Sequence, residues 1–171
     1  MKQLDFTDCG QIRTAEMQKR HDAFWGSLDE ARRTATRVAC DFFAFADEVQ
    51  WQMCLHRHHA KDDAEKSKEA FIRAQMFARC ALGKFRLFCM VLGCRDDAEG
   101  IHRLDRIVEY SRKCQWVIFP AWWTRRPDKN TAYFIGQFKI HAGQYTEYLA
   151  KRREEAEKKA EAKAKQKGGA K

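Results

Sequence analysis

The sequence contains very little proline and no long uninterrupted apolar run. Only two prolines occur in 171 residues, and because proline breaks helices, this scarcity favours an all-helical fold. The most apolar window, residues 85–94, contains Arg86 and is far too short to span a bilayer. The first residues also lack the apolar run of a signal peptide. We therefore expect a cytoplasmic protein that has no membrane partner.

The seven cysteines lack the number and the spacing of a disulfide framework. Their number is odd, most lie within apolar runs, and no Cys-x₂-Cys pair of a structural zinc site occurs. One group, Cys54 with His56, His58 and His59, offers two ligands on one helical face, but no second ligand pair accompanies it. Positive side chains at the end of a helix are explained by the helix dipole. We predict no bound metal.

Motifs of nucleotide binding and catalysis are also absent. The sequence has no glycine-rich phosphate loop, no Gly-x-Ser-x-Gly and no paired Glu-x-x-His segments. The sequence therefore carries no motif of P-loop nucleotide binding, α/β-hydrolase chemistry or a di-iron bundle. We therefore predict a non-enzymatic protein without a cofactor.

What the sequence does contain is two long apolar stripes, in residues 28–59 and 63–93. Their apolar residues recur in steps of three and four, which place them on one helical face, whereas a strand needs steps of two. A short linker favours antiparallel neighbours. We predict an αα-hairpin whose core contains the aromatic residues Phe42, Phe45, Phe71, Phe85 and Phe88.

Three further helices complete a predicted all-α bundle of about five helices. One covers residues 11–25, one follows Asp96 and runs until Pro120 stops it, with Ile118 on its apolar face, and the last begins near Thr131. Ser27 with Glu30 matches a capping box at the start of the hairpin. Asp62 and Asp63 suit the next N-cap, Asp96 or Asp97 suits the N-cap of the fourth helix, and Gly93 suits a left-handed helix end.

The predicted domain organisation is one helical domain followed by a charged tail. Residues 1–150 form the domain, and residues 151–171 consist largely of Ala, Glu and Lys. Because this tail has no apolar stripe, we expect a solvated helix or a frayed extension.

The charge distribution points towards anionic partners. The net charge is +9, and residues 70–95 contain no Asp or Glu. The cations of this stretch are therefore expected to lack acidic partners, and Arg79, Gly83 and Arg86 share one helical face. Such a face is suited to contact with a phosphate backbone or with another helix. The candidate nucleic-acid-binding residues here are Arg73, Arg79, Lys84 and Arg86.

A second stretch without acids, residues 111–127, combines cations with aromatic residues. Guanidinium groups beside indole rings in a loop suit base stacking together with phosphate contact. The candidates in this stretch are Arg112, Lys113, Trp122, Trp123, Arg125 and Arg126. In the alternative interpretation the arginine stems cover apolar surface and the tryptophan pair closes one end of the core.

Arg95 and His102 are separated by a spacing that also occurs in nucleases. Six residues separate them, and Asp96 follows the arginine. This arrangement resembles the Arg-x₄₋₆-His signature of the HEPN family, whose all-helical domains are in many cases ribonucleases that use the Arg and His at a dimer interface. The resemblance covers residues 95–102 and the helical class. It implies Arg95 and His102 as catalytic residues.

These features favour a small nucleic-acid-binding subunit of a larger ribonucleoprotein assembly. Its expected partners are RNA or single-stranded DNA and other protein subunits. The analogy is to the small helical subunits of CRISPR effector complexes, and it rests on size, helicity and charge. One alternative is a protein–protein adaptor or inhibitor, such as a phage or plasmid accessory protein, with Trp122 and Trp123 as its hot spot. The other alternative is the HEPN-like ribonuclease.

Overall fold

The chain is an assembly of helices. The structure, a computed structural model, describes residues 14–124 and 130–168, with the backbone alone for residues 124 and 163–168. Within these ranges there is no strand, and the predicted all-α class is confirmed. The elements are α1 (Ala15–Gly26), α2 (Glu30–His59), α3 (Ala64–Val91), α4 (Asp97–Lys113), the 3₁₀ turn η1 (Ala121–Thr124) and α5 (Thr131–Gly168).

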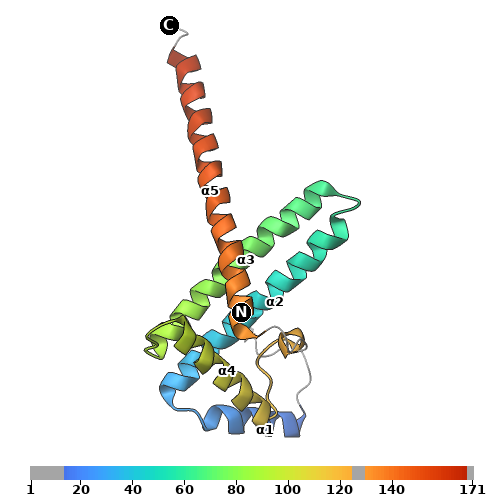
Figure 1. The fold of residues 1–171 in the computed structure, drawn as a ribbon, viewed down its shortest axis with the longest axis vertical. Helices are drawn as coiled ribbons and strands as arrows, with labels where there is room; N and C mark the ends of the chain where they lie inside the picture. Colours follow the sequence, from blue (N-terminus) through green and yellow to red (C-terminus); the bar gives the residue numbers. More distant parts are fainter. Residues whose placement is uncertain (1–13, 125–129, 169–171) are drawn as a thin grey trace.

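The predicted hairpin is present as α2 and α3, which run antiparallel and lie side by side (Figure 1). Near their turn, the Ser67 hydroxyl donates to the carbonyl of His56 at 3.1 Å. Further along, the Lys84 ammonium lies 2.6 Å from the Asp41 carboxylate. The first half of α5 crosses the hairpin, whereas α1 and α4 lie at the end away from the turn (Figure 1).

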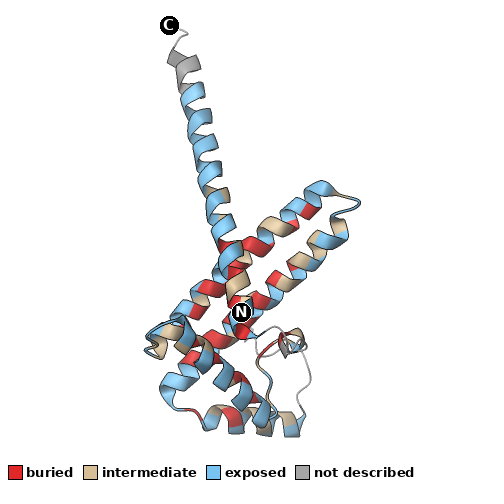
Figure 2. Cartoon of the chain, in the orientation of Figure 1, coloured by how far each residue is buried: buried red, intermediate tan, exposed pale blue. Residues whose placement is uncertain are grey.

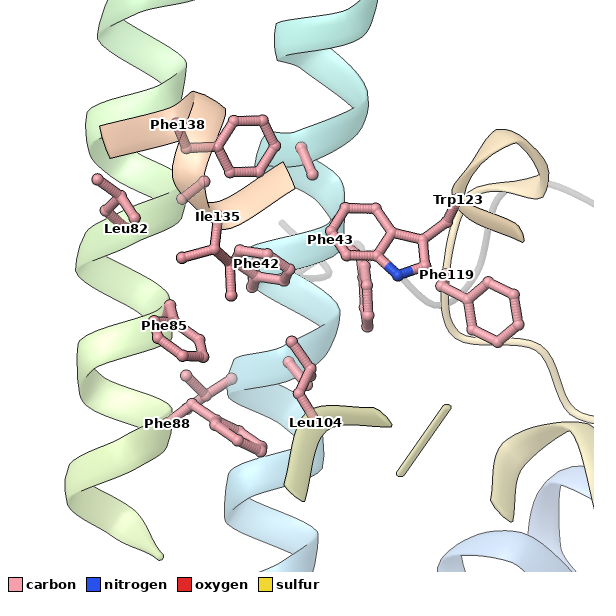
Figure 3. Close-up of a cluster of buried hydrophobic side chains, with 14 of the residues drawn as sticks. Phe42, Phe43, Leu82, Phe85, Phe88, Leu104, Phe119, Trp123, Ile135 and Phe138 are labelled. Atoms are coloured by element: carbon pink, nitrogen blue, oxygen red, sulfur yellow. The ribbon is translucent and has the colours of Figure 1, made fainter. Parts of the chain in front are cut away.

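The core is an aromatic cluster enclosed by the hairpin, α5 and η1 (Figure 3). Phe42 lies at its centre, with ring centroids 5.6 Å from Trp123, 6.1 Å from Phe138 and 6.2 Å from Phe85. Tilted and edge-to-face aromatic pairs at such distances add to the stabilisation by area burial. The alternation of large Phe with small Ala along both stripes lets the two helices interdigitate.

Two of the five predicted core aromatics lie at its edge instead. Phe42, Phe85 and Phe88 are each 1% exposed, but Phe45 and Phe71 are only half-buried. Conversely, Phe43 is 1% exposed although it lies outside the predicted stripe. Trp123 packs against it, with centroids 5.0 Å apart. The buried face of α2 is therefore wider than contact with α3 alone requires, because the segment that contains Trp123 also covers it.

Most predicted helix ends are confirmed. The side chains of Asp63 and Asp96 accept hydrogen bonds from the third backbone N–H of their helices. Gly93 has φ +62°, and the backbone N–H of Cys94 donates to the carbonyl of Cys89 at 2.9 Å. This arrangement is a Schellman motif.

The predicted capping box at Ser27 is wrong. Asp29 caps α2 and accepts from the backbone N–H of Arg32 at 2.8 Å. Ser27 is instead the C-cap of α1, and its hydroxyl donates to the carbonyl of Phe24 at 2.7 Å. Asp29, two residues after Ser27, is the N-cap of α2 instead. The predicted boundary is therefore correct, but the predicted capping residue is wrong.

The predicted extent of α4 is also wrong, because the helix ends at Lys113 rather than at Pro120. Gln115 adopts φ +55°, and the backbone N–H of Trp116 donates to the carbonyl of Ser111 at 2.9 Å. Ile118 consequently lies beyond the helix rather than on its apolar face. The early end turns the chain back, so that Phe119 and Trp123 reach Phe43.

The last helix confirms the charged C-terminal extension. α5 runs without a break from Thr131 to Gly168 and buries Ile135, Phe138 and Ala142 in its first half. Residues 150–162 are exposed on every side of the helix (Figure 2). Among the helices of the described ranges, none is long and apolar enough to cross a membrane.

Candidate binding surface

Two of the four candidate cations of α3 are engaged within the chain. Arg73 forms an ion pair with Glu69 at 2.5 Å, and Lys84 forms one with Asp41 at 2.6 Å. Both acids lie outside the acid-free stretch, one of them a single residue before it and the other on the neighbouring helix. The expectation that these two cations lack acidic partners is therefore wrong.

Of the four candidate cations of α3, Arg79 and Arg86 remain unpaired. Both are exposed, and neither forms an ion pair within the described part of the chain. They are seven residues apart, which is about two helical turns or ~10.5 Å along the axis. We call these two residues the arginine edge.

The described cations of the second group have partners within the chain. The guanidinium of Arg112 lies 5.5 Å from the ring centroid of Phe119, and Lys113 pairs with Glu109 at 3.0 Å. Arg125 and Arg126 lie outside the described residues.

The tryptophan pair closes the core. Trp123 is 4% exposed, which leaves little ring surface for a base. Trp122 is half-buried against Phe134, and its indole N–H donates to the Asp47 carboxylate at 2.6 Å. These contacts favour the alternative interpretation of the pair, in which both rings serve packing.

The residues of the nuclease resemblance are exposed at the start of α4. Arg95 lies 3.2 Å from Glu99, which also binds Arg103 at 2.7 Å. The backbone N–H of Arg95, followed by the Arg103 and Arg95 side chains, lowers the pKa of Glu99 to about 2. Arg95 thus carries a permanent counter-charge, and His102 lies exposed on the following turn of helix.

The histidine group near the hairpin turn has a structural explanation. Nδ1 of His56 lies 2.9 Å from the Ser67 hydroxyl, and the His56 ring packs against Phe71. His58 and His59 contact each other edge-to-face at 5.1 Å between centroids. In the described ranges, no three His, Cys, Asp or Glu side chains are grouped so that they could hold a metal ion.

The structure reveals a surface that the sequence analysis missed, on the face of α3 opposite the core. Leu87 is 40% exposed and Met90 is 76% exposed, although both belong to the helix that lines the core. Cys80 and Gly83 are also exposed, and Ile72 and Met76 are half-buried. Successive members are three or four residues apart, so they share one helical face. The outward stripe consists of Ile72, Met76, Cys80, Gly83, Leu87 and Met90.

Gly83 lies at the middle of the outward stripe and has no packing role in the described structure. No neighbouring atom lies within 4 Å of the position that a Cβ would occupy there. A glycine inside a helix costs about 1 kcal/mol relative to alanine. Because internal packing does not require it, this glycine leaves room for the close approach of a second backbone.

A hollow lies on α4. It has a volume of about 290 Å³ and is lined by Arg106, Glu109, Tyr110 and Lys113. All four belong to one helix, so no second element encloses a ligand there. Geometry therefore places the strongest candidate surface on α3, where the outward stripe adjoins the arginine edge.

This chain matches none of the protein-family models, curated proteins or solved structures with which it was compared.

Proposed function

We propose that this chain is a non-enzymatic helical subunit of a larger assembly and that it docks a partner protein on the outward stripe of α3. The observation that carries the proposal is the exposure of Leu87 and Met90 on a helix already buried along its opposite face. Single exposed apolar residues are ordinary, but several exposed or half-buried ones aligned along one helix are typical of an interaction surface.

The surface geometry changes the order of the functional hypotheses. The sequence favours nucleic-acid binding, in part through Trp122 and Trp123. In the folded chain these rings contact Asp47 and Phe134 and close the core. An adaptor therefore has a stronger basis than a strand-binding protein, with α3 rather than the tryptophan pair as its contact surface.

Replacing the most exposed residues of the stripe tests the proposal. The double variant Leu87→Glu/Met90→Glu places charge on the docking face, whereas Trp51→Glu is a matched control on α2, where Trp51 is 59% exposed. Tagged full-length chains would be used to capture proteins from extracts of the source cells, with quantitative mass spectrometry as the readout. We expect one protein to be retained by the wild type and by Trp51→Glu and to be lost by the double variant.

Two results decide the outcome of this experiment. Circular dichroism of each variant must show intact helical folding, so that a loss of binding reflects the surface. If folded Leu87→Glu/Met90→Glu retains every protein that the wild type retains, the docking proposal is wrong.

A nucleic-acid-binding subunit is the second candidate, and the arginine edge favours it. Arg79 and Arg86 are exposed without ion pairs in the described chain, and the net charge is +9. Each neutralised phosphate adds ~0.7–0.9 to the slope of log affinity against log salt. Arg79→Gln/Arg86→Gln should therefore reduce this slope by nearly two, whereas Arg37→Gln on α2 should not change it. Absence of binding to single- and double-stranded probes at low salt would exclude this candidate.

The state of the cysteines supports a cytoplasmic location for the proposed subunit. All six cysteines in the described ranges are free thiols. Burial, together with the nearby Cys94 thiol, raises the pKa of Cys89 to about 12, so its thiol stays protonated. A protonated, half-buried thiol is a packing group rather than a nucleophile, in keeping with a non-enzymatic role.

A further inference from the structure

The cations that border the outward stripe are neutralised on one side only. On one side, Arg73 pairs with Glu69 and Lys84 pairs with Asp41. On the other side is the arginine edge, for which the described chain supplies no carboxylate. The stripe is therefore an apolar surface with two uncompensated positive charges along a single border.

We infer that the outward stripe binds an amphipathic helix of a partner protein whose apolar face is bordered by carboxylates seven residues apart. This inference rests on the proposed docking function and specifies the chemistry of the partner. The arginine edge repeats after seven residues, which is the spacing at which a packed helix presents the same side. Carboxylates at that spacing would meet both arginines at once, as flanking charges do in paired helices.

Gly83 lies between the two arginines in the sequence and suits the closest point of this contact. The space around its missing Cβ is open, so a partner backbone can approach there more closely than over a larger residue. Leu87 and Met90 then provide apolar area on one side of that point, and Met76 on the other. Long, flexible methionine side chains adapt readily to the surface of a bound helix.

A second copy of this chain would be a poor occupant of the stripe. Pairs of identical chains are usually related by two-fold symmetry. In an antiparallel pair the same border of both helices comes together, so Arg79 would face Arg86 of the other copy. In a parallel pair the arginine edge would face the border that holds Arg73 and Lys84. The antiparallel arrangement places cations against cations, and in the parallel arrangement the carboxylates of the facing border are already paired with Arg73 and Lys84.

A nucleic-acid strand also fits this surface less well than an acidic helix. A phosphate backbone could neutralise Arg79 and Arg86, but it would leave Leu87 and Met90 exposed beside it. An acidic amphipathic helix satisfies both features together, since it covers the apolar residues and supplies the missing charge. The apolar contact would provide most of the affinity, and the charges would set orientation and partner choice.

Two designed peptides of opposite charge test the inference. Each is a helical peptide of about 20 residues with leucines along one face. One carries glutamates at seven-residue spacing beside that face, and the other carries lysines at the same positions. Fluorescence anisotropy would measure their binding to the full-length chain, with a single-stranded oligonucleotide as a third probe.

We expect the glutamate peptide to bind more tightly than the lysine peptide. Arg79→Gln/Arg86→Gln should weaken binding of the glutamate peptide about two- to tenfold, because exposed ion pairs contribute modestly. The matched control Arg37→Gln, an exposed arginine on α2, should leave binding unchanged. Leu87→Glu/Met90→Glu should abolish binding of the glutamate peptide.

Several outcomes would overturn the inference. These are equal affinity for the two peptides, failure of the glutamate peptide to bind, an equal effect of Arg37→Gln, or binding of the oligonucleotide alone. If one of them occurs while Leu87→Glu/Met90→Glu still loses the captured protein, the docking function stands and only the acidic helix is wrong. If the double variant loses nothing in either experiment, both proposals fail.

Discussion

At the scale of single residues, position relative to the covering segments decides how much an aromatic ring contributes to stability. Phe42 is 1% exposed and has aromatic neighbours on α2, α3, η1 and α5, whereas Phe45 is half-buried and stacks on Phe77 with centroids 6.2 Å apart. We expect Phe42→Ala to lower the free energy of unfolding by ~3–5 kcal/mol and Phe45→Ala by clearly less. Urea denaturation of both variants measures the difference, and equal losses would contradict the burial of the two rings.

Glu99 is a carboxylate whose pKa is strongly lowered by its hydrogen bonds. It accepts hydrogen bonds from the backbone N–H of Arg95 and from the side chains of Arg95 and Arg103, and its pKa falls from 4.5 to about 2. A carboxylate with a lowered pKa stabilises the folded state fully above its unfolded pKa and loses this effect as the pH falls towards its folded pKa.

The resulting prediction concerns acid stability. Between about pH 5 and about pH 2 the wild type should lose the contribution of Glu99 progressively, whereas Glu99→Gln should lack that part of the pH dependence. Thermal unfolding followed across this range measures the effect, with Glu48→Gln, at an exposed position on α2, as the control. Identical pH profiles for the wild type and Glu99→Gln would show that the hydrogen bonds to Glu99 do not favour its ionised form.

At the scale of elements, α3 and α4 end in the same type of C-terminal motif, with a different residue in the left-handed position. Gly93 at φ +62° and Gln115 at φ +55° occupy equivalent positions of Schellman motifs. A side chain is unfavourable in this left-handed conformation, whereas glycine is not.

Reciprocal substitutions test this equivalence. Gly93→Ala should lower the free energy of unfolding by ~1 kcal/mol, although a Cβ there meets no neighbouring atom. Gln115→Gly should raise it by up to ~1 kcal/mol, because relief of strain outweighs the added freedom of the unfolded chain. Urea titrations of both variants provide the values. A loss of stability in Gln115→Gly would show that its side chain makes a compensating contact.

These ends also show which parts of the fold the sequence could predict. Asp63, Asp96 and Gly93 act on their own helices through local backbone bonds, and their roles were predicted correctly. The end of α4 could not be predicted, because no glycine marks Gln115 and the turn serves contacts of Phe119 and Trp123 with distant Phe43. Local chemistry is visible in a sequence, whereas a turn imposed by tertiary packing is not.

The candidate site was harder to predict for the same reason. The ion pair of Lys84 with Asp41 and the hydrogen bond of Trp122 with Asp47 each join residues far apart in the chain. The outward stripe did have a local signal, since Met76, Leu87 and their companions follow the same steps of three and four as the core stripe. A helix with two apolar faces ordinarily indicates burial on both, and only the fold shows that one of them is open.

At the scale of the whole molecule, the chain combines a packed body with a long protruding helix. The first half of α5 crosses the hairpin, and its second half extends away from every other element (Figure 1). The protruding part is exposed from residue 150 to residue 162 and consists of Ala, Glu, Lys and Arg (Figure 2). Good helix formers such as Ala, Glu, Lys and Arg maintain such a segment without a core.

This division predicts unequal effects of truncation. Deletion of residues 151–171 should change the free energy of unfolding by no more than ~0.5 kcal/mol, since the segment buries almost no apolar surface. Deletion from residue 138 onwards should unfold the body, because it removes Phe138 and Ala142 from the core. Thermal unfolding of both truncated chains measures the contrast. The shorter deletion should also leave capture through Leu87 and Met90 intact, because those residues lie on α3. A large loss of stability on removing residues 151–171 would mean that the protruding helix docks against the body or against a second molecule.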